Sequence, residues 1–156
     1  IQSTIIYLTI YLVMNLGAFA CIFMMKRESI FYENIKDLSG LSKNHPALAL
    51  SFLIILFSLA GIPPLAGFFA KFYVFMAVIE ANMYALAIIG LVTTVVSAFY
   101  YLRIIKIIYF DKPNKPFDES YDWGLKSSLI LSSILILTYF IYPSILTNVV
   151  YSIIIY

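Results

Sequence analysis

Long apolar stretches separated by short polar segments organise this chain of 156 residues. A helix needs about 20 apolar residues to cross the hydrocarbon core of a bilayer. Four stretches reach or approach that length, and none shows the alternation with a period of two that marks a strand of a membrane barrel. The pattern therefore predicts an all-α membrane protein with four transmembrane spans, at about residues 1–25, 46–80, 83–107 and 126–142.

The second stretch contains a sequence that no continuous helix accommodates. Residues 61–67 read Gly-Ile-Pro-Pro-Leu-Ala-Gly, and proline lacks the N–H group of a helical hydrogen bond and clashes with the preceding turn. Either two short helices form a hairpin, or two half-helices together make one crossing. The residues assigned to the helix break are Gly61, Pro63, Pro64 and Gly67.

The distribution of charge distinguishes the two alternatives. Of the ten basic residues, all except Lys71 fall in two segments, 26–45 and 103–126, whereas the link between the second and third spans carries only Glu80. A single broken crossing places both basic segments on one side of the membrane, as the positive-inside rule requires, and a hairpin would place them on opposite sides. We therefore expect one discontinuous helix, with cytoplasmic or matrix loops at 26–45 and 108–125.

Composition excludes several classes of protein. The chain is 63% hydrophobic and only 12% charged, which rules out an ordinary soluble enzyme, a disordered tail and a nucleic-acid binder. The single cysteine, Cys21, excludes an intrachain disulfide. Because the chain begins at Ile1 inside an apolar stretch, we interpret it as a fragment of a larger protein. Polar residues at helical spacing predict that the C-terminal segment, 143–156, lies at the membrane interface.

Lys71 is the only charged side chain away from the ends of a predicted span; the others, Glu80, Arg103, Lys106 and Lys126, lie near span ends. It precedes Asn82, in the link just after that span, by about 16 Å of helix, and half a hydrocarbon core is about 15 Å. A lysine near the middle of the membrane should face protein or water, and burial there favours its neutral form. Such an amine can exchange a proton, which arginine cannot do. The alternative is a structural lysine that forms an ion pair with another span; the interfaces are too far away for its ~6 Å stem to reach.

Other polar residues could complete a path for protons. Ser58 and Tyr73 flank the break, where either could form a hydrogen bond with a freed backbone group. A polar face of the third span could carry water near Lys71 or serve helix packing, and it comprises Thr93, Thr94, Ser97, Tyr100 and Tyr101. The sequence contains no phosphate loop, catalytic triad, haem or iron–sulfur motif, so we expect neither a cofactor nor a metal in this chain.

The residues around Lys71 resemble a known family. The stretch SLAGIPPLAGFFAKFYVF (58–75) is similar to the C-terminal half of subunit N of proton-pumping NADH:quinone oxidoreductase, respiratory complex I, whose mitochondrial equivalent is NADH dehydrogenase subunit 2. The stretches MNLGAFA (14–20), DLSGL (37–41) and SAFYYLRIIKIIYFD (97–111) fit the same family. The broken-helix motif is shared with subunits L and M and with Mrp-type cation/proton antiporters, but the residues that follow Lys71 are more similar to subunit N.

The resemblance implies the C-terminal part of an antiporter-like helix bundle. Lys71 would transfer protons in the outlet half of the path, and the subunit would couple electron transfer from NADH to quinone to proton translocation. NADH, FMN, iron–sulfur clusters and quinone would bind to other subunits. The implied partners are the other membrane subunits, the missing N-terminal half of the subunit and the lipid bilayer, in a bacterial inner (plasma) membrane or a mitochondrial inner membrane.

Two other interpretations stay open at this point. One is a subunit of an Mrp-type cation/proton antiporter, because the same broken helix occurs there. The other is a structural membrane fragment without a transport role. In either complex we do not expect the fragment to be active alone, because half of a channel has no input path.

Overall fold

The computed structural model describes residues 2–28, 30–32, 34–118, 122–139, 141–144, 148 and 150. The long helices are α1 (Gln2–Phe23), α3 (Pro46–Ala60), α4 (Ala66–Glu80), α5 (Tyr84–Phe110) and α6 (Trp123–Thr138). The short elements are β1 (Lys26–Arg27), β2 (Ile30–Phe31), η1 (Ile35–Leu38) and α2 (Leu41–Asn44).

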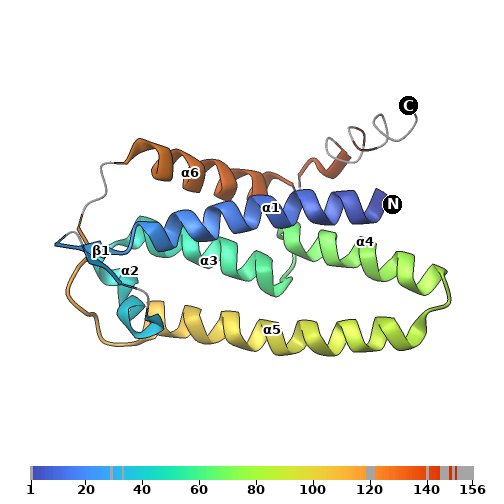
Figure 1. Cartoon of the computed structure of the whole chain (residues 1–156), viewed down its shortest axis with the longest axis horizontal. Helices are drawn as coiled ribbons and strands as arrows, with labels where there is room; N and C mark the ends of the chain where they lie inside the picture. The colour runs from blue at the N-terminus through green and yellow to red at the C-terminus, as the bar shows by residue number, and fades with distance from the viewer. Residues whose placement is uncertain are drawn as a thin grey trace.

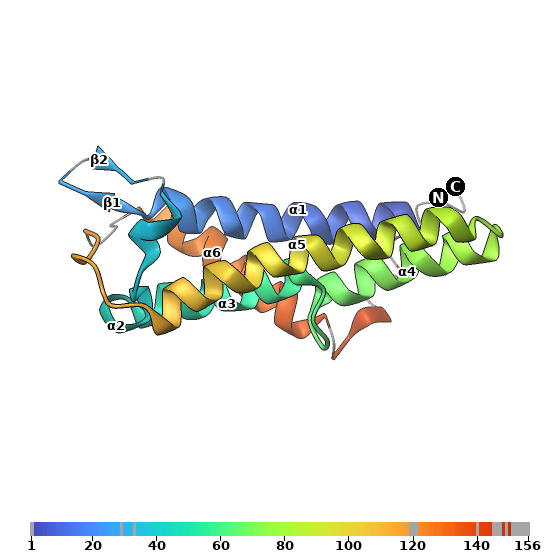
Figure 2. The same cartoon turned by 90° about the horizontal axis from the view of Figure 1, so that it is seen from below.

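The long helices lie side by side along the long axis of the molecule (Figures 1 and 2). α1 packs against α6, α4 and α3, and α5 packs along α3 and α4. α3 and α4 follow one another along this axis, so that the turn after α4 lies at the opposite end from α2 (Figure 1). The prediction of one discontinuous helix that crosses the bundle is confirmed, and the hairpin is excluded.

Backbone chemistry explains where these helices begin and end. α3 begins at Pro46, a position where the missing N–H costs nothing. It ends at Ala60, and the next residue, Gly61, has a φ of +84°, in the left-handed region that favours glycine. α6 begins after Asp122, whose side chain accepts a hydrogen bond from the Gly124 N–H at 2.9 Å.

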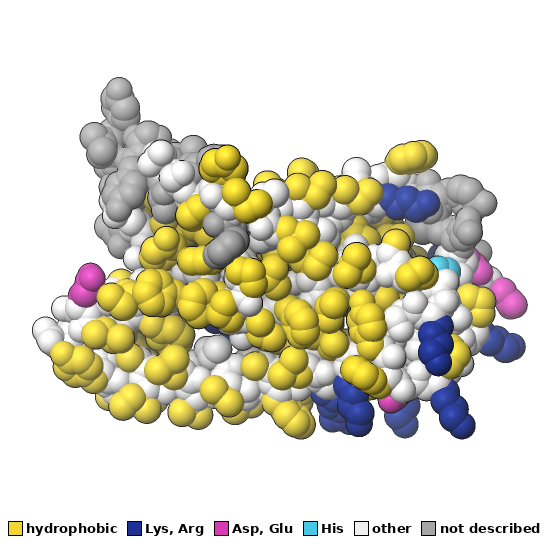
Figure 3. Space-filling model, turned by 180° about the vertical axis from the view of Figure 1, so that it is seen from behind, with side chains coloured by type: hydrophobic (Ala, Val, Ile, Leu, Met, Phe, Trp, Pro, Cys, Tyr) yellow, Lys and Arg dark blue, Asp and Glu magenta, His cyan; other side chains and the backbone are white. Residues whose placement is uncertain are grey.

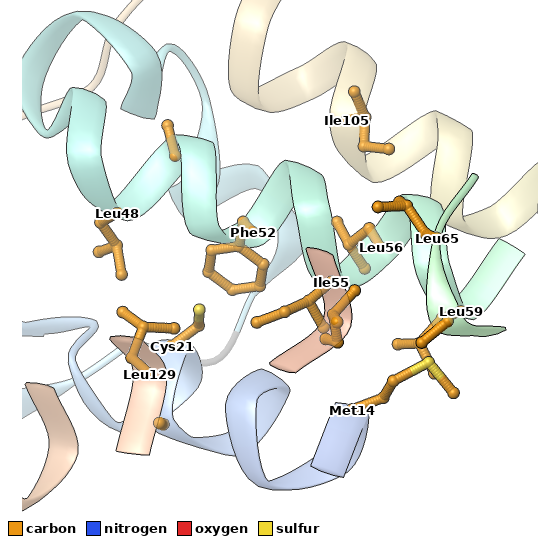
Figure 4. Packing of buried hydrophobic residues seen from close by; sticks show 14 of the residues in the cluster. Met14, Cys21, Leu48, Phe52, Ile55, Leu56, Leu59, Leu65, Ile105 and Leu129 are labelled. Carbon is orange, nitrogen blue, oxygen red and sulfur yellow. The ribbon is translucent and has the colours of Figure 1, made fainter. Parts of the chain in front are cut away.

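A closely packed core joins α1, α3 and α6 (Figure 4). Gly17 allows this approach, because a Cβ there would lie 2.8 Å from Ile55 Cδ1 and 2.9 Å from Ser132 Cβ. Cys21 and Ile55 are both 0% exposed. The sulfur of Cys21 lies among apolar side chains in this core, where a thiol behaves as a small hydrophobic group.

The surface has an apolar middle and one basic end (Figure 3). α5 exposes large apolar side chains along its length, with Val95 69%, Phe99 64% and Ile88 62% exposed. By length and composition, α1 and α5 are each able to cross a membrane, and α3 and α6 are shorter apolar helices. An apolar area this extensive belongs against lipid or against other membrane helices.

The helix bounds differ from the sequence-based ones at several places. α5 continues to Phe110, and α6 begins at Trp123, where Asp122 caps it, and ends at Thr138. Pro143 has no N–H to donate to the carbonyl of residue 139, which accounts for the earlier end. The segment predicted as a loop over 26–45 contains the β1–β2 hairpin, η1 and α2. The interfacial segment predicted over 143–156 lies mostly outside the described residues.

Candidate functional site

The two prolines of the break remove specific hydrogen bonds from the end of α3. In a continuous helix the N–H of residue i+4 donates to the carbonyl of residue i. The donor for the Leu59 carbonyl would therefore be residue 63, and the donor for the Ala60 carbonyl would be residue 64. Neither proline has an N–H. The Gly61 N–H keeps its helical bond to the Phe57 carbonyl at 3.1 Å, and the Ile62 N–H donates to the same carbonyl at 3.0 Å rather than to that of Ser58. The carbonyls of Leu59 and Ala60 therefore lose their helical donors.

Lys71 supplies one of the missing donors. Its Nζ donates to the Leu59 carbonyl oxygen at 2.8 Å. The side chain reaches this oxygen by passing along Gly61, where a Cβ would lie 3.2 Å from Lys71 Cδ. The carbonyl end of a helix carries a partial negative charge, which favours a cation at this point. A half-buried lysine of α4 thus caps the C-terminus of α3.

Ser58 makes the reciprocal contact from α3 to α4. The Gly67 N–H, in the first turn of α4, donates to Ser58 Oγ at 2.9 Å. The Ser58 hydroxyl in turn donates to Met14 Sδ at 3.0 Å, and its side chain is 0% exposed. Gly67 is required here because a Cβ would overlap the Ser58 carbonyl. Each half-helix is therefore capped by a side chain of the other.

A cavity of about 260 Å³ lies beside the amine of Lys71. Its wall comes from α1, α3, α4 and α5. The lining residues are Tyr7, Tyr11, Met14, Leu59, Gly67, Lys71, Thr93, Thr94, Ser97 and Tyr101. The structure thus places four of the five hydroxyl residues singled out on the third span beside Lys71, whereas Tyr100 does not line the cavity.

The hydroxyls of Thr93, Thr94 and Ser97 face this cavity chiefly as hydrogen-bond acceptors. Thr93 Oγ1 and Thr94 Oγ1 both donate to the Gly90 carbonyl, at 2.8 and 2.9 Å, and Ser97 Oγ donates to the Thr93 carbonyl at 2.9 Å. A hydroxyl has one proton to donate and two lone pairs that accept. With the protons used inside the helix, the lone pairs are left for a cation such as an ammonium or hydronium group.

Tyr73 lies away from this arrangement. It does not line the cavity, and it interacts with Tyr139 just after α6. Tyr139 also packs against Phe69, with ring centroids 5.7 Å apart. Of the two residues predicted to satisfy the freed backbone groups, Ser58 does so and Tyr73 contacts the neighbouring helix end instead.

Sequence reasoning did not single out the two tyrosines of α1. Tyr7 and Tyr11 stack with ring centroids 5.8 Å apart and planes 9° apart. Tyrosines four residues apart on an apolar helix share one face, and this spacing is the sequence feature that could have pointed to Tyr7 and Tyr11. Among the described residues no group of three or more His, Cys, Asp or Glu side chains is placed to hold a metal ion.

The fold and the site together define a class of protein. It is a bundle of apolar helices in which a discontinuous helix holds an ionisable side chain beside a polar cavity, an arrangement found in membrane transport proteins. The family model for the membrane region of NADH:quinone oxidoreductase and Mrp antiporter subunits matches residues 1–97, and the chain belongs to this family.

Curated relatives agree with the resemblance noted around Lys71. The chain is 64% identical over 150 residues to NADH-quinone oxidoreductase subunit N of Pelagibacter ubique, a match that covers 96% of the chain and 32% of the relative. It is 51% identical over 144 residues to the protein of the same name from Parvibaculum lavamentivorans, with 92% and 30% covered. The chain thus spans about a third of the length of these relatives.

Solved structures share the fold. Respiratory complex I from Thermus thermophilus with bound aureothin contains a chain that matches with a TM-score of 0.82 and 29% identity, over 94% of this chain and 34% of that one. The Mrp complex from Dietzia sp. DQ12-45-1b matches with a TM-score of 0.81 and 20% identity, over 96% of this chain and 36% of that one. At that identity the Mrp match supports the fold alone.

Proposed function

We propose that this chain is part of subunit N of an NADH-quinone oxidoreductase and carries protons through the membrane as electrons pass from NADH to quinone. The identity of 64% to a protein with that name supports the assignment. The sequence carries no haem or iron–sulfur motif. NADH, FMN, iron–sulfur clusters and quinone are bound by other subunits, and this subunit uses the energy that their reaction releases.

The observation that carries the proposal is the position of the Lys71 amine. Its Nζ lies 2.8 Å from a carbonyl that the helix break has freed, and it borders a cavity rich in hydroxyl groups. When a proton arrives, an N–H bond forms and the ammonium is stabilised by the carbonyl and by the acceptor lone pairs of α5. When the proton leaves, it passes to water in the cavity and the amine becomes neutral.

The partners follow from the family and the surface. The apolar faces of α1 and α5 are covered by lipid, by the upstream part of the same subunit and by neighbouring membrane subunits of the complex. The basic end, which includes Arg103 and Lys106, lies on the cytoplasmic side of a bacterial plasma membrane, in accordance with the positive-inside rule.

Purification of the full-length protein that contains this segment tests the proposal. We expect flavin and iron–sulfur proteins, detected by their absorption, to copurify with it. In vesicles, the purified complex should acidify one compartment only when NADH and a quinone are supplied. A pH-sensitive dye measures the acidification. Sodium/proton exchange without NADH, by a preparation lacking flavin and iron–sulfur, would contradict the proposal and favour an antiporter. If an intact preparation shows neither activity, the segment has a structural role without transport.

A further inference from the structure

The α1 side of the cavity carries two phenols that take no part in the hydrogen bonds of the helix break. Tyr7 and Tyr11 lie one helical turn apart, and both line the cavity that holds Lys71. Tyr101 of α5 lines the same cavity and interacts electrostatically with both of them. Three phenols from two helices therefore meet beside one lysine.

These phenols differ from the other hydroxyls of the cavity in whether their protons are already donated to a protein group. The α5 residues Thr93, Thr94 and Ser97 have used their protons on backbone carbonyls. Among the described residues, the hydroxyls of the three tyrosines form no hydrogen bond with a protein group. Apart from the Lys71 amine, the phenols are thus the side chains of the cavity wall that can both accept a proton and donate one.

The cavity has room to connect these groups through water. Its volume of about 260 Å³ is enough for several water molecules, and a polar wall with several hydrogen-bonding partners retains them. A water that contacts both the amine and a phenol can pass a proton between them.

The tyrosines extend the cavity in one direction. Met14 of α1 contacts Ser58 at the helix break, and Tyr11 and Tyr7 follow at successive turns toward the N-terminal end of α1. That end lies opposite the basic loops (Figure 1). The pair therefore leads from the level of the break toward the less charged end of the bundle.

We propose that Tyr7 and Tyr11 relay the proton of Lys71 toward the end of the molecule opposite the basic loops. The inference rests on the proposed function. An N–H bond of the Lys71 ammonium breaks and an O–H bond forms on a cavity water. A phenol then accepts a proton on its oxygen while its own O–H bond breaks toward the next water. One proton has moved, and both tyrosines are neutral before and after.

Phenylalanine substitutions in the complete complex test the relay. Tyr7→Phe with Tyr11→Phe should slow NADH-driven pumping about tenfold, less than loss of a group that acts directly as acid or base, because water can partly replace a phenol. Tyr100→Phe is the matched control, since this neighbour of Tyr101 is 58% exposed, packs against Phe99 and does not line the cavity. It should pump at the normal rate.

A second variant separates a relay from a packing role. Replacement of Tyr11 by 3,5-difluorotyrosine keeps the ring and the hydroxyl but makes the phenol more acidic. The groups that face it are Lys71 from α4 and Tyr101 from α5, with Tyr7 on its own helix. We expect the pH profile of pumping to shift to lower pH, which a merely structural phenol would not cause.

The outcomes distinguish this inference from the proposed function. Normal pumping by the double phenylalanine variant, in a complex that Lys71→Met inactivates, overturns the relay and leaves the function intact. An unchanged pH profile with difluorotyrosine also overturns it. Normal pumping by Lys71→Met overturns both.

Discussion

Replacement of Lys71 by methionine is expected to reduce NADH-driven proton pumping at least tenfold, since a positioned proton-transfer group contributes roughly 10²–10⁴-fold to a rate. Methionine has a similar length and no titratable proton, so it fills the space beside Gly61 without serving the Leu59 carbonyl. Pumping is measured in vesicles that contain the complete complex, with electron transfer from NADH to an artificial acceptor as the measure of intact redox subunits.

The controls separate charge from proton exchange. Lys106→Met removes an exposed lysine from the basic end of α5 and should leave pumping unchanged. Lys71→Arg keeps a charged donor near the Leu59 carbonyl but cannot release its proton, so it should fail like methionine. Normal pumping by Lys71→Met would show that the amine takes no part in proton transfer.

Gly67→Ala is expected to destabilise the subunit more than any other glycine-to-alanine change in helices α1 to α6. A Cβ at this position overlaps the backbone carbonyl of Ser58, which has no freedom to move aside. Overpacking of this kind costs about 1–3 kcal/mol, or more where backbone must shift, and it also pulls the Gly67 N–H away from Ser58 Oγ. The amount of assembled complex and its thermal unfolding temperature measure the effect.

Two variants calibrate this result. At Gly90 a Cβ would meet Phe75 Cε1 at 2.8 Å, but that ring belongs to a side chain that can turn aside, so Gly90→Ala should be tolerated. Ser58→Ala removes the acceptor of the Gly67 N–H without crowding, and leaving a buried donor unpaired costs about 1–3 kcal/mol. Equal stability of the Gly67→Ala and Gly90→Ala proteins would mean that the two half-helices are not held as closely as described.

Much of the fold could be predicted from the sequence because its determinants are local or additive. Pro63 and Pro64 cannot continue a helix wherever they lie in a bundle. The positions of the basic residues together indicate which loops lie on the same side of the membrane, and the structure places the basic segments at one end of the molecule (Figure 3). The position of Lys71 near the middle of the membrane comes from counting residues along one helix, and it stays a prediction.

The contacts within the site could not be predicted in the same way. A helix that is apolar all round presents no polar face, so its rotation about its own axis cannot be read from its periodicity. Whether Tyr7 and Tyr11 face Lys71 depends on the rotation of α1 about its own axis. The two prolines indicate which carbonyls are freed, those of Leu59 and Ala60. That the Lys71 amine donates to one of them depends on how α4 is placed after the break, which the sequence does not show.

The central claim is that the Lys71 amine acts by gaining and losing a proton, and chemical replacement of this side chain tests it most directly. In a Lys71→Cys complex, 2-bromoethylamine rebuilds a lysine-like side chain with sulfur in place of one methylene, and 2-bromoethanol builds the same chain ending in a hydroxyl. Cys21 is fully buried and so protected from both reagents.

We predict that the cysteine variant does not pump, that the amine restores pumping with a pH profile shifted to lower pH because sulfur makes the amine more acidic, and that the alcohol restores nothing. Equal rescue by the alcohol would contradict the claim, since it would reduce Lys71 to a hydrogen-bond donor for the Leu59 carbonyl.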